Sequence, residues 1–131
     1  MYAAGAPHPL RGPAVRLIKA VRDGHFEATI SAEVVQEVLH RFVAIRRPEI
    51  GAQLARDALD LFAPVVPITH RVMDRMPELV ARYPMLAARD LVHVATCVEN
   101  EMGTIVSADR GFDGVAELRR VSIEDAPRLL T

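Results

Sequence analysis

Apolar residues recur at helical spacing through most of the chain, and polar residues fill the positions between them. A first helix is predicted from Arg11 to Gly24, where Val15, Ile18 and Val21 share one face. Four further helices are predicted from the same kind of pattern. They run from Ser31 as N-cap to about Arg46, between Pro48 and Pro64, from Thr69 with a kink or break at Pro77, and from Ala87 to Met102.

Short apolar and β-branched runs between these helices predict strands. The runs extend from Phe26 to Ile30, from Val65 to Ile68, from Thr104 to Ala108 and from Leu118 to Val121. The third run is continuous, which is the pattern of a strand buried on both faces. Strands that alternate with helices require parallel crossover connections, so we expect an α/β fold in three layers, with a parallel sheet flanked by helices. Such folds place their sites at the carboxyl ends of the strands.

Length and composition indicate a single domain over residues 1–131, because half of the 131 residues are hydrophobic and can bury one core. The sequence has no run of about 18 apolar residues and no signal-peptide pattern, so we expect a cytoplasmic protein without membrane segments. Cys97 is the only cysteine, which excludes an internal disulfide and a cysteine-based zinc cluster. Oxygen or histidine ligands are the options left for a metal.

The balance of charge argues against a protein that grips nucleic acid through a strong overall field. The formal net charge is −1. Of the 16 basic residues, Lys19 is the only lysine and the others are arginines. Arginine suits bidentate contact with phosphate or with the carboxylates of a partner. A biased genomic composition gives the same ratio, so the arginine content alone does not decide between these explanations.

Four acidic residues lie where the predicted fold would gather them. Asp109 follows the strand predicted to end at Ala108, and Asp113 lies in the same loop. Asp90 lies in the first turn of its predicted helix, and Glu37 lies in the second turn of another. Carboxylates that lie close together repel, so a cluster near neutral pH needs protons or cations. Mg²⁺ or Mn²⁺ is the expected cofactor, because these hard ions prefer oxygen ligands and bridge to phosphate.

Each acid also has a purely structural interpretation. The macrodipole favours Asp90 in a first helical turn, and Glu37 fits a solvated helix flank. Asp109 and Asp113 are residue types that often form turns, here around Arg110 and Gly111. The functional interpretation therefore depends on the combination of acids.

Three segments with these acids carry a family resemblance. The segment from Ser31 to Arg41 looks like the glutamate-bearing helix of PIN domains, and the segment from Ala87 to Asn100 is similar to the helix with the third acid. The segment from Ile105 to Asp113 resembles the strand and loop that hold the remaining acids, and it is the most specific of the three. Order and spacing match, so nearly the whole chain resembles a PIN domain of the VapC-type toxins.

The resemblance implies a divalent-metal-dependent endoribonuclease. Glu37, Asp90 and Asp109 would be metal ligands, and Asp113 would be an auxiliary ligand or position a water. The resemblance also implies an RNA substrate, a cognate antitoxin protein that holds the toxin inactive, and a homodimer. PIN domains open with a strand that ends in an aspartate, whereas no acid precedes Asp23 here. We therefore expect an N-terminally incomplete domain that lacks the first metal ligand.

Two other functions compete with this interpretation. A non-catalytic PIN module that binds an antitoxin or RNA would tolerate the missing ligand. A phosphoacceptor receiver domain is also α/β, but it needs an acid pair and a central aspartate in the first half of the chain, and neither is visible. His93 and Cys97 have metal-ligand spacing, and we interpret both as packing beside the apolar face of their helix. Arg110 either contacts RNA phosphate or is a solvated loop charge.

Overall fold

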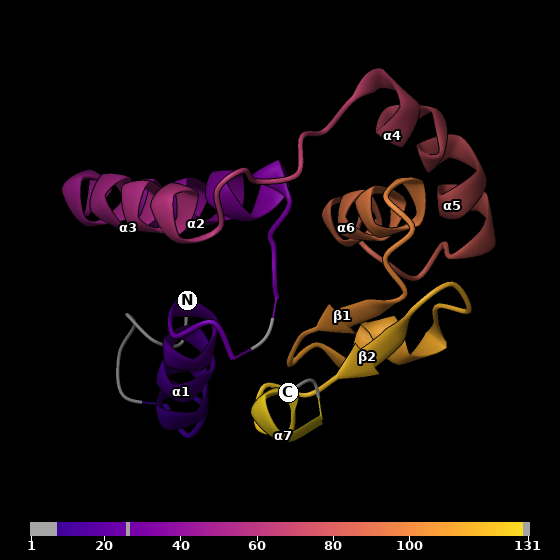
Figure 1. Cartoon of the computed structure of the whole chain (residues 1–131). Coiled ribbons are helices and arrows are strands. Elements are labelled where there is room, and N and C mark those ends of the chain that lie inside the picture. Colours follow the sequence, from indigo (N-terminus) through magenta and orange to yellow (C-terminus); the bar gives the residue numbers. More distant parts are fainter. Residues whose placement is uncertain (1–7, 26, 130–131) are drawn as a thin grey trace. The chain divides into compact units, whose positions relative to one another are not determined.

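The computed structural model describes residues 8–25 and 27–129 of the chain (Figure 1). Residues 1–7 lie outside the described part, as does Phe26 of the first predicted strand. The chain forms two compact units. One joins the two ends of the chain, Met1–Ala28 and Met102–Thr131, and the other is the continuous segment Thr29–Glu101. Helices together with a parallel sheet make the fold α/β, as the sequence pattern predicts.

A short parallel sheet organises the first unit. Strand β1, Thr104–Val106, pairs with β2, Arg119–Val121, and Val106 lies opposite Val121. The connection between the strands contains the 3-10 helix η1, Arg110–Gly114, which lies against β2. The loop predicted to follow the strand is therefore a compact turn of helix held on the sheet.

Two helices complete the first unit and lie against each other. The apolar spacing predicts α1, Arg11–Arg22, whereas no apolar period predicts a helix as short as α7, Ala126–Leu129. A local signal exists just before α7, because the Ser122 hydroxyl accepts a hydrogen bond from the Asp125 N–H at 3.2 Å and stabilises the turn that leads into the helix. The core of this unit consists of Ala14, Phe112, Val115, Leu118, Val121 and Ala126.

Two long helices, α2 (Ala32–Ala44) and α3 (Pro48–Leu61), lie side by side in the second unit (Figure 1). The short link between them includes Arg46, which adopts a left-handed backbone conformation with φ of 61°. Gly51 allows the helices to approach closely, because a Cβ atom built there would lie 2.7 Å from the Cβ of Phe42. The hairpin therefore depends on the absence of a side chain at this position.

The other two helices of this unit pack around α6, Ala88–Glu99. Helices α4, His70–Asp74, and α5, Met76–Arg82, both lie against it. Pro77 lies in the first turn of α5, which confirms the predicted break. The predicted cap of α4 is also confirmed, since the Thr69 hydroxyl accepts a hydrogen bond from a backbone N–H at 3.2 Å. The core of this unit consists of Val38, Phe42, Ala55, Val72, Met76, Leu79, Leu91, Val94 and Ala95.

Two of the predicted strands do not form among the described residues. Their segments meet in one isolated parallel bridge between Ser31 and Val66. The Val66 N–H donates to the Ile30 carbonyl at 2.9 Å, and the Val66 carbonyl accepts from the Ala32 N–H at 2.8 Å. The ladder stops there because Ser31 leads directly into α2 and Pro67 has no N–H to donate.

Strand β1 is more exposed than its sequence predicts. Thr104 is exposed, and Ile105 and Val106 are half-buried, so the prediction of a strand buried on both faces is wrong. The reason is that the sheet has only β1 and β2 within the described residues, and each is therefore an edge strand there. The prediction of β2 itself is confirmed.

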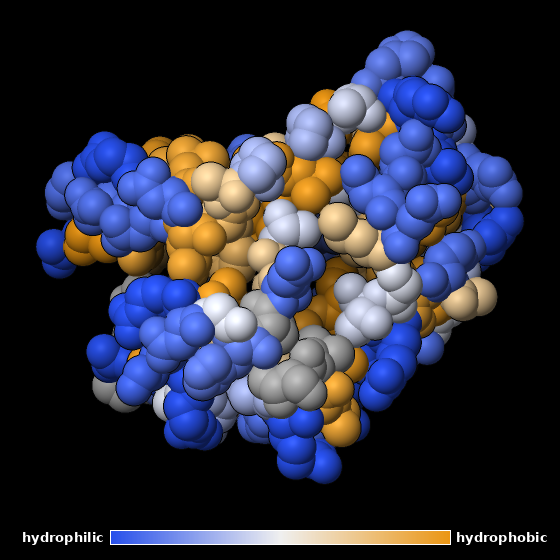
Figure 2. Space-filling view, viewed as in Figure 1, coloured by the Kyte–Doolittle hydropathy of each residue, from blue (hydrophilic) through white to orange (hydrophobic). Residues whose placement is uncertain are grey.

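The α2–α3 hairpin keeps apolar side chains on its surface as well as in the core. Figure 2 shows apolar residues gathered over these two helices. The two most exposed are 59% and 54% accessible, and the set consists of Leu39, Val43, Ile45, Ile50 and Leu59. Contiguous exposed apolar surface commonly marks an interaction site. None of the helices in the described part of the chain has the length and apolar character to cross a membrane.

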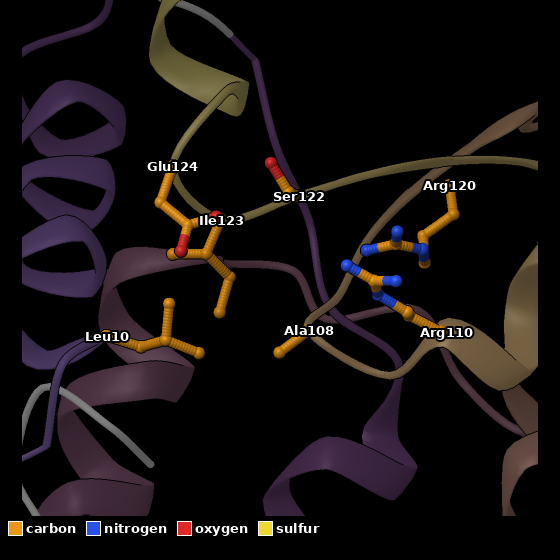
Figure 3. A pocket seen from close by; sticks show the side chains of 7 residues that line it. All are labelled: Leu10, Ala108, Arg110, Arg120, Ser122, Ile123 and Glu124. Atoms are coloured by element: carbon orange, nitrogen blue, oxygen red, sulfur yellow. The ribbon is translucent and has the colours of Figure 1, made fainter.

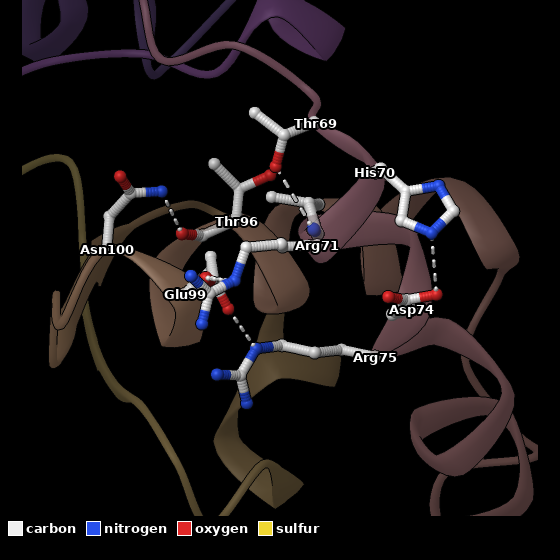
Figure 4. A network of polar contacts seen from close by, with 9 residues as sticks. Thr69, His70, Arg71, Asp74, Arg75, Thr96, Glu99 and Asn100 are labelled. Carbon is white, nitrogen blue, oxygen red and sulfur yellow. Dashed lines mark hydrogen bonds and ion pairs between the residues drawn. The ribbon is translucent and has the colours of Figure 1, made fainter.

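A charged network fastens α4 to α6 (Figure 4). Glu99, the last residue of α6, accepts a hydrogen bond from the Arg75 Nε at 2.7 Å and lies 3.0 Å from the Arg71 Nε. The hydrogen bond from Arg75, followed by the charges of both arginines, holds the pKa of Glu99 below its usual range against the effect of desolvation. Glu99 is therefore ionised at neutral pH and joins the two helices.

The close contact at Gly51 predicts that Gly51→Ala destabilises the protein, although alanine is the better helix former. The gain in helix propensity is about 1 kcal/mol, whereas overpacking typically costs about 1–3 kcal/mol, so we expect a net loss of up to about 2 kcal/mol. Urea unfolding measures this loss. Gly12→Ala is the matched control, because its new Cβ would meet only the flexible end of Arg16 at 3.3 Å. Equal stability of the Gly51→Ala and wild-type proteins would contradict the packing account.

The lowered pKa of Glu99 predicts a pH-dependent contribution to stability. A carboxyl group whose pKa is lower in the folded state stabilises that state above its ordinary pKa of about 4.3, and the contribution disappears as pH falls through the folded value. Wild type should therefore melt higher than Glu99→Gln at pH 7, and the two melting temperatures should converge in acid. Glu78→Gln is the control, since its ion pair with Arg82 is exposed. A difference between wild type and Glu99→Gln that stays constant with pH would refute this assignment.

Candidate functional site

A chain of hydrogen bonds joins α2 to α6 in the second unit. The Oγ of Ser31 lies 3.0 Å from the Nδ1 of His93, and the Nε2 of His93 lies 2.9 Å from the Oε1 of Glu37. The His93 side chain is 12% exposed and that of Glu37 is 31% exposed. One of the predicted acids is therefore held by an inward-facing histidine and still reaches solvent.

The Glu37 carboxylate fixes the tautomer of neutral His93. An ionised carboxylate only accepts hydrogen bonds, so Nε2 carries the proton that is donated to Glu37. Nδ1 is then the acceptor, and the Ser31 hydroxyl donates to it. With this donor and acceptor order, the Ser31 hydroxyl and both ring nitrogens have a hydrogen-bond partner. The partner of Ser31 matters because this residue is only 8% exposed.

These three residue types also occur in serine hydrolases, but the arrangement here is not a nucleophilic triad. A nucleophilic serine has to reach the substrate, and Ser31 is buried at the start of α2. Its hydroxyl contacts His93 and makes no cap hydrogen bond with the helix. Ser31 is at the N-cap position as predicted, yet its side chain serves the histidine.

The role of His93 was not predicted from the sequence beyond packing at the edge of α6. Its ring is largely buried, as expected, but both ring nitrogens are engaged in polar contacts. The one available signal was its position, since His93 lies one helical turn after Asp90 and on the same flank of α6. Asp90 is in the first turn of α6 and half-buried. Burial raises the pKa of the Cys97 thiol on the same helix, which suits a packing role.

The other two predicted acids belong to the first unit and lie around η1. Asp109 is the N-cap residue of η1, and its Oδ1 accepts a hydrogen bond from the Gly111 N–H at 2.8 Å. Its own N–H donates to the Ser107 hydroxyl at 3.0 Å. Asp109 thus forms the turn that its sequence context predicts, while the residue remains exposed. Asp113 follows within η1, and its side chain is 53% exposed.

Arg120 on β2 anchors this loop. Its Nε donates to the Asp113 carboxylate at 2.7 Å, and a second guanidinium nitrogen donates to the Ser107 carbonyl at 2.8 Å. The hydrogen bond from Arg120, followed by the charges of Arg120 and Arg110, holds the pKa of Asp113 below its usual range. Asp113 is therefore ionised at neutral pH and fixed in orientation.

A cavity of about 170 Å³ opens beside this loop in the first unit (Figure 3). The guanidinium groups of Arg110 and Arg120 lie at one end, and the other end has apolar side chains together with the carboxylate of Glu124. The lining residues are Leu10, Ala108, Arg110, Arg120, Ser122, Ile123 and Glu124. Because Arg120 is already bonded to Asp113, Arg110 is the cation that has donors to offer a ligand.

The four predicted acids thus divide between the two units, Glu37 and Asp90 in one and Asp109 and Asp113 in the other. Within the described residues, no three histidine, cysteine, aspartate or glutamate side chains gather closely enough to hold a metal ion. The metal centre built from all four acids remains a prediction. Oxygen donors of this kind suit Mg²⁺ or Mn²⁺ by their chemistry.

Comparison with known proteins identifies the family. The PIN domain family matches residues 1–118, so the chain belongs to the PIN domain family, and its resemblance to the VapC type is confirmed. Ribonuclease VapC13 of Mycobacterium tuberculosis is 36% identical over 123 residues, which cover 93% of each chain. A VapC ribonuclease of Mycobacterium bovis matches to the same extent. Ribonuclease VapC7 of Mycobacterium tuberculosis is 32% identical and covers 100% of this chain and 90% of its own. No solved structure matches the chain significantly.

The bridge from Arg120 predicts energetic coupling between β2 and η1. Asp113→Asn and Arg120→Met should each lower the melting temperature, and the double variant should lose less than the sum of the two, because both remove one ion pair. Arg120→Met should cost more, since the Ser107 carbonyl also loses its donor. Thermal melts of the four proteins give the coupling. The exposed pair of Arg128 and Asp125 is the control and should show almost none. Strict additivity at Arg120 and Asp113 would contradict the bridging role.

Proposed function

We propose that this PIN domain is a divalent-metal-dependent endoribonuclease, and that it acts as the toxin of a toxin–antitoxin pair in the cytoplasm. Membership of the PIN family supports this proposal, as do its relatives, which are named VapC ribonucleases. The observation that carries it is the presence of acids at the expected places on α2, on α6 and in the turn after β1. Family membership and these positions point to the same chemistry.

In this proposal Glu37, Asp90 and Asp109 hold Mg²⁺ or Mn²⁺, and Asp113 orients a water or acts as an auxiliary ligand. A bound divalent ion supplies Lewis acidity and charge neutralisation at a phosphodiester. The residues of the chain supply orientation. Glu37 and Asp109 each commit one carboxylate oxygen to a protein N–H donor, so each carboxylate is aimed before a ligand arrives.

RNA is the proposed substrate, and the loop after β1 offers a place for its backbone. Arg110 borders the cavity of Figure 3 and lies next to Asp109 in sequence. A guanidinium group donates hydrogen bonds in the fork geometry that a phosphate accepts. A phosphate held there would lie beside one of the proposed catalytic acids. The small net charge of the chain implies weak, salt-sensitive binding outside such specific contacts.

An antitoxin and a second copy of the chain are the proposed protein partners. The exposed apolar surface of the α2–α3 hairpin supports association, because apolar anchors dominate stable interfaces. The same hairpin begins with the helix that carries Glu37. A partner that covers it would lie close to one proposed ligand of the metal, which fits inhibition by a bound antitoxin.

Substitution of one acid tests the catalytic proposal. Asp109→Asn should lower Mg²⁺- or Mn²⁺-dependent RNA cleavage at least about 100-fold. Loss of a metal ligand should lower activity more than loss of a residue that only hydrogen-bonds to a ligand, which typically costs about 10–100-fold. The Asn side chain keeps an oxygen for the Gly111 N–H, so the turn should remain folded and the melting temperature should be nearly unchanged. Cleavage of a defined RNA with metal and with excess chelator, beside a thermal melt, measures both effects.

Asp60→Asn on the exposed side of α3 is the matched control and should retain full activity. Cleavage that persists in excess chelator would contradict the metal mechanism. If neither wild type nor Asp109→Asn cuts RNA in the presence of metal while the protein still binds RNA or an antitoxin, the alternative of a non-catalytic PIN module is the better description.

A further inference from the structure

We propose that His93 is a positioning residue, which aims the Glu37 carboxylate at the metal through its Nε2–H while Ser31 holds the Nδ1 side of its ring. This inference rests on the proposed function, because it takes Glu37 to be a metal ligand. His93 itself touches neither metal nor RNA in this scheme. The geometry that carries the proposal lies entirely within the second unit.

Burial and distance set His93 apart from an ordinary surface histidine. Its side chain is 12% exposed, and both ring nitrogens lie within 3.0 Å of a polar partner. Ser31 is buried, and its hydroxyl bonds to the ring although the N-cap position offers it a backbone partner. Ser31 and Glu37 therefore together fix the orientation of the His93 ring.

The chain of hydrogen bonds has a direction that suits a ligand acid. The Glu37 carboxylate only accepts, so the neutral ring carries its proton on Nε2 and donates it to Oε1, and Nδ1 accepts from the Ser31 hydroxyl. With Oε1 occupied, Oε2 is the oxygen that Glu37 presents to an outside cation. Protein groups that bond to ligating carboxylates orient them in this way, and their removal typically weakens metal binding by about 10–100-fold.

The same contacts also link α2 to α6, so a purely structural strap is the competing explanation. If the contacts are only a strap, substitutions of His93 weaken metal binding only as far as they destabilise the unit. An equal loss of stability elsewhere in the unit then weakens metal binding equally. A positioning role predicts dependence on a donor at the place of Nε2. Gln carries an amide nitrogen at about the reach of Nε2, whereas Phe keeps the ring volume without any donor.

The decisive measurement is Mn²⁺ affinity of the full chain, followed by titration calorimetry or by the electron paramagnetic resonance signal of free Mn²⁺. His93→Phe should bind Mn²⁺ about 10–100-fold more weakly than wild type, and His93→Gln should recover most of that loss. Ser31→Ala should weaken binding to a lesser degree, because Glu37 keeps its donor but the ring loses the partner that holds its orientation at Nδ1. The ¹⁵N shifts of the ring should show the Nε2–H tautomer in wild type and also in Ser31→Ala, because Glu37 still accepts from Nε2.

Two controls separate the possible failures. Glu99→Gln breaks the link of α6 to α4 without touching Glu37 and should leave Mn²⁺ affinity unchanged. Glu37→Gln should lose binding. If His93→Phe binds Mn²⁺ as tightly as wild type does, the positioning role is overturned, while Glu37 remains a ligand. The positioning role is also overturned if His93→Phe, His93→Gln and Glu99→Gln all lose the same amount of Mn²⁺ affinity. Equal affinities of wild type and Glu37→Gln overturn the proposed function and the role of His93 with it.

Discussion

Burial of one face of α6 is the constraint on which the second unit depends. Leu91, Val94 and Ala95 are at most 1% exposed, and α4 and α5 pack around the helix that carries them. A helix fixed so firmly cannot rotate, so the residues on its edge are fixed as well. Asp90 and His93 lie on that edge, one turn apart. The orientation of His93 toward Glu37 is thus a consequence of core packing before it is a matter of chemistry.

Three of the four acids proposed for the site are each held by a donor from their own unit. Glu37 is bonded to His93, Asp109 to the Gly111 N–H, and Asp113 to the Arg120 guanidinium. Carboxylates that are to share a cation repel one another before it binds. Hydrogen bonds to fixed donors offset part of this repulsion and limit the side-chain freedom that ligand binding would otherwise remove. Each of these three acids is thus oriented by a hydrogen-bond donor from its own unit.

The sequence predicted those parts of the fold that depend on neighbouring residues. Thr69 caps α4, Pro77 separates α5 from α4, and the acids lie on the expected elements because caps, breaks and helical periods are local properties. Strand burial was wrong at Thr104, since exposure of a strand depends on how many partners it has across the sheet. The strand expected near Val66 is a single bridge, because Ser31 leads directly into α2 and Pro67 has no N–H to donate.

The contacts of the site likewise divide into those set by neighbouring residues and those set by residues far apart in the sequence. Asp109 was recognised because an aspartate after a strand is a local pattern, and its cap on η1 follows from the same pattern. The hydrogen bond from His93 to Glu37 joins residues 56 positions apart, and no spacing along the chain reports it. Arg120 was missed likewise, because its ion pair with Asp113 depends on the register of β2 against β1. Periodicity finds the acids, and only packing reveals what holds them.

The proposal to test is that Glu37, Asp90 and Asp109 hold one divalent ion, with Asp113 as an auxiliary ligand or water-positioning residue. Paramagnetic Mn²⁺ tests it directly, because it broadens the NMR signals of nuclei near its binding site. In a titration of the ¹⁵N-labelled chain, the amide signals around Glu37, Asp90, Asp109 and Asp113 should broaden together with one midpoint, and signals of the exposed flank of α3 should stay sharp. Broadening confined to the residues of one unit, or spread evenly over the surface acids without saturation, would contradict the proposal.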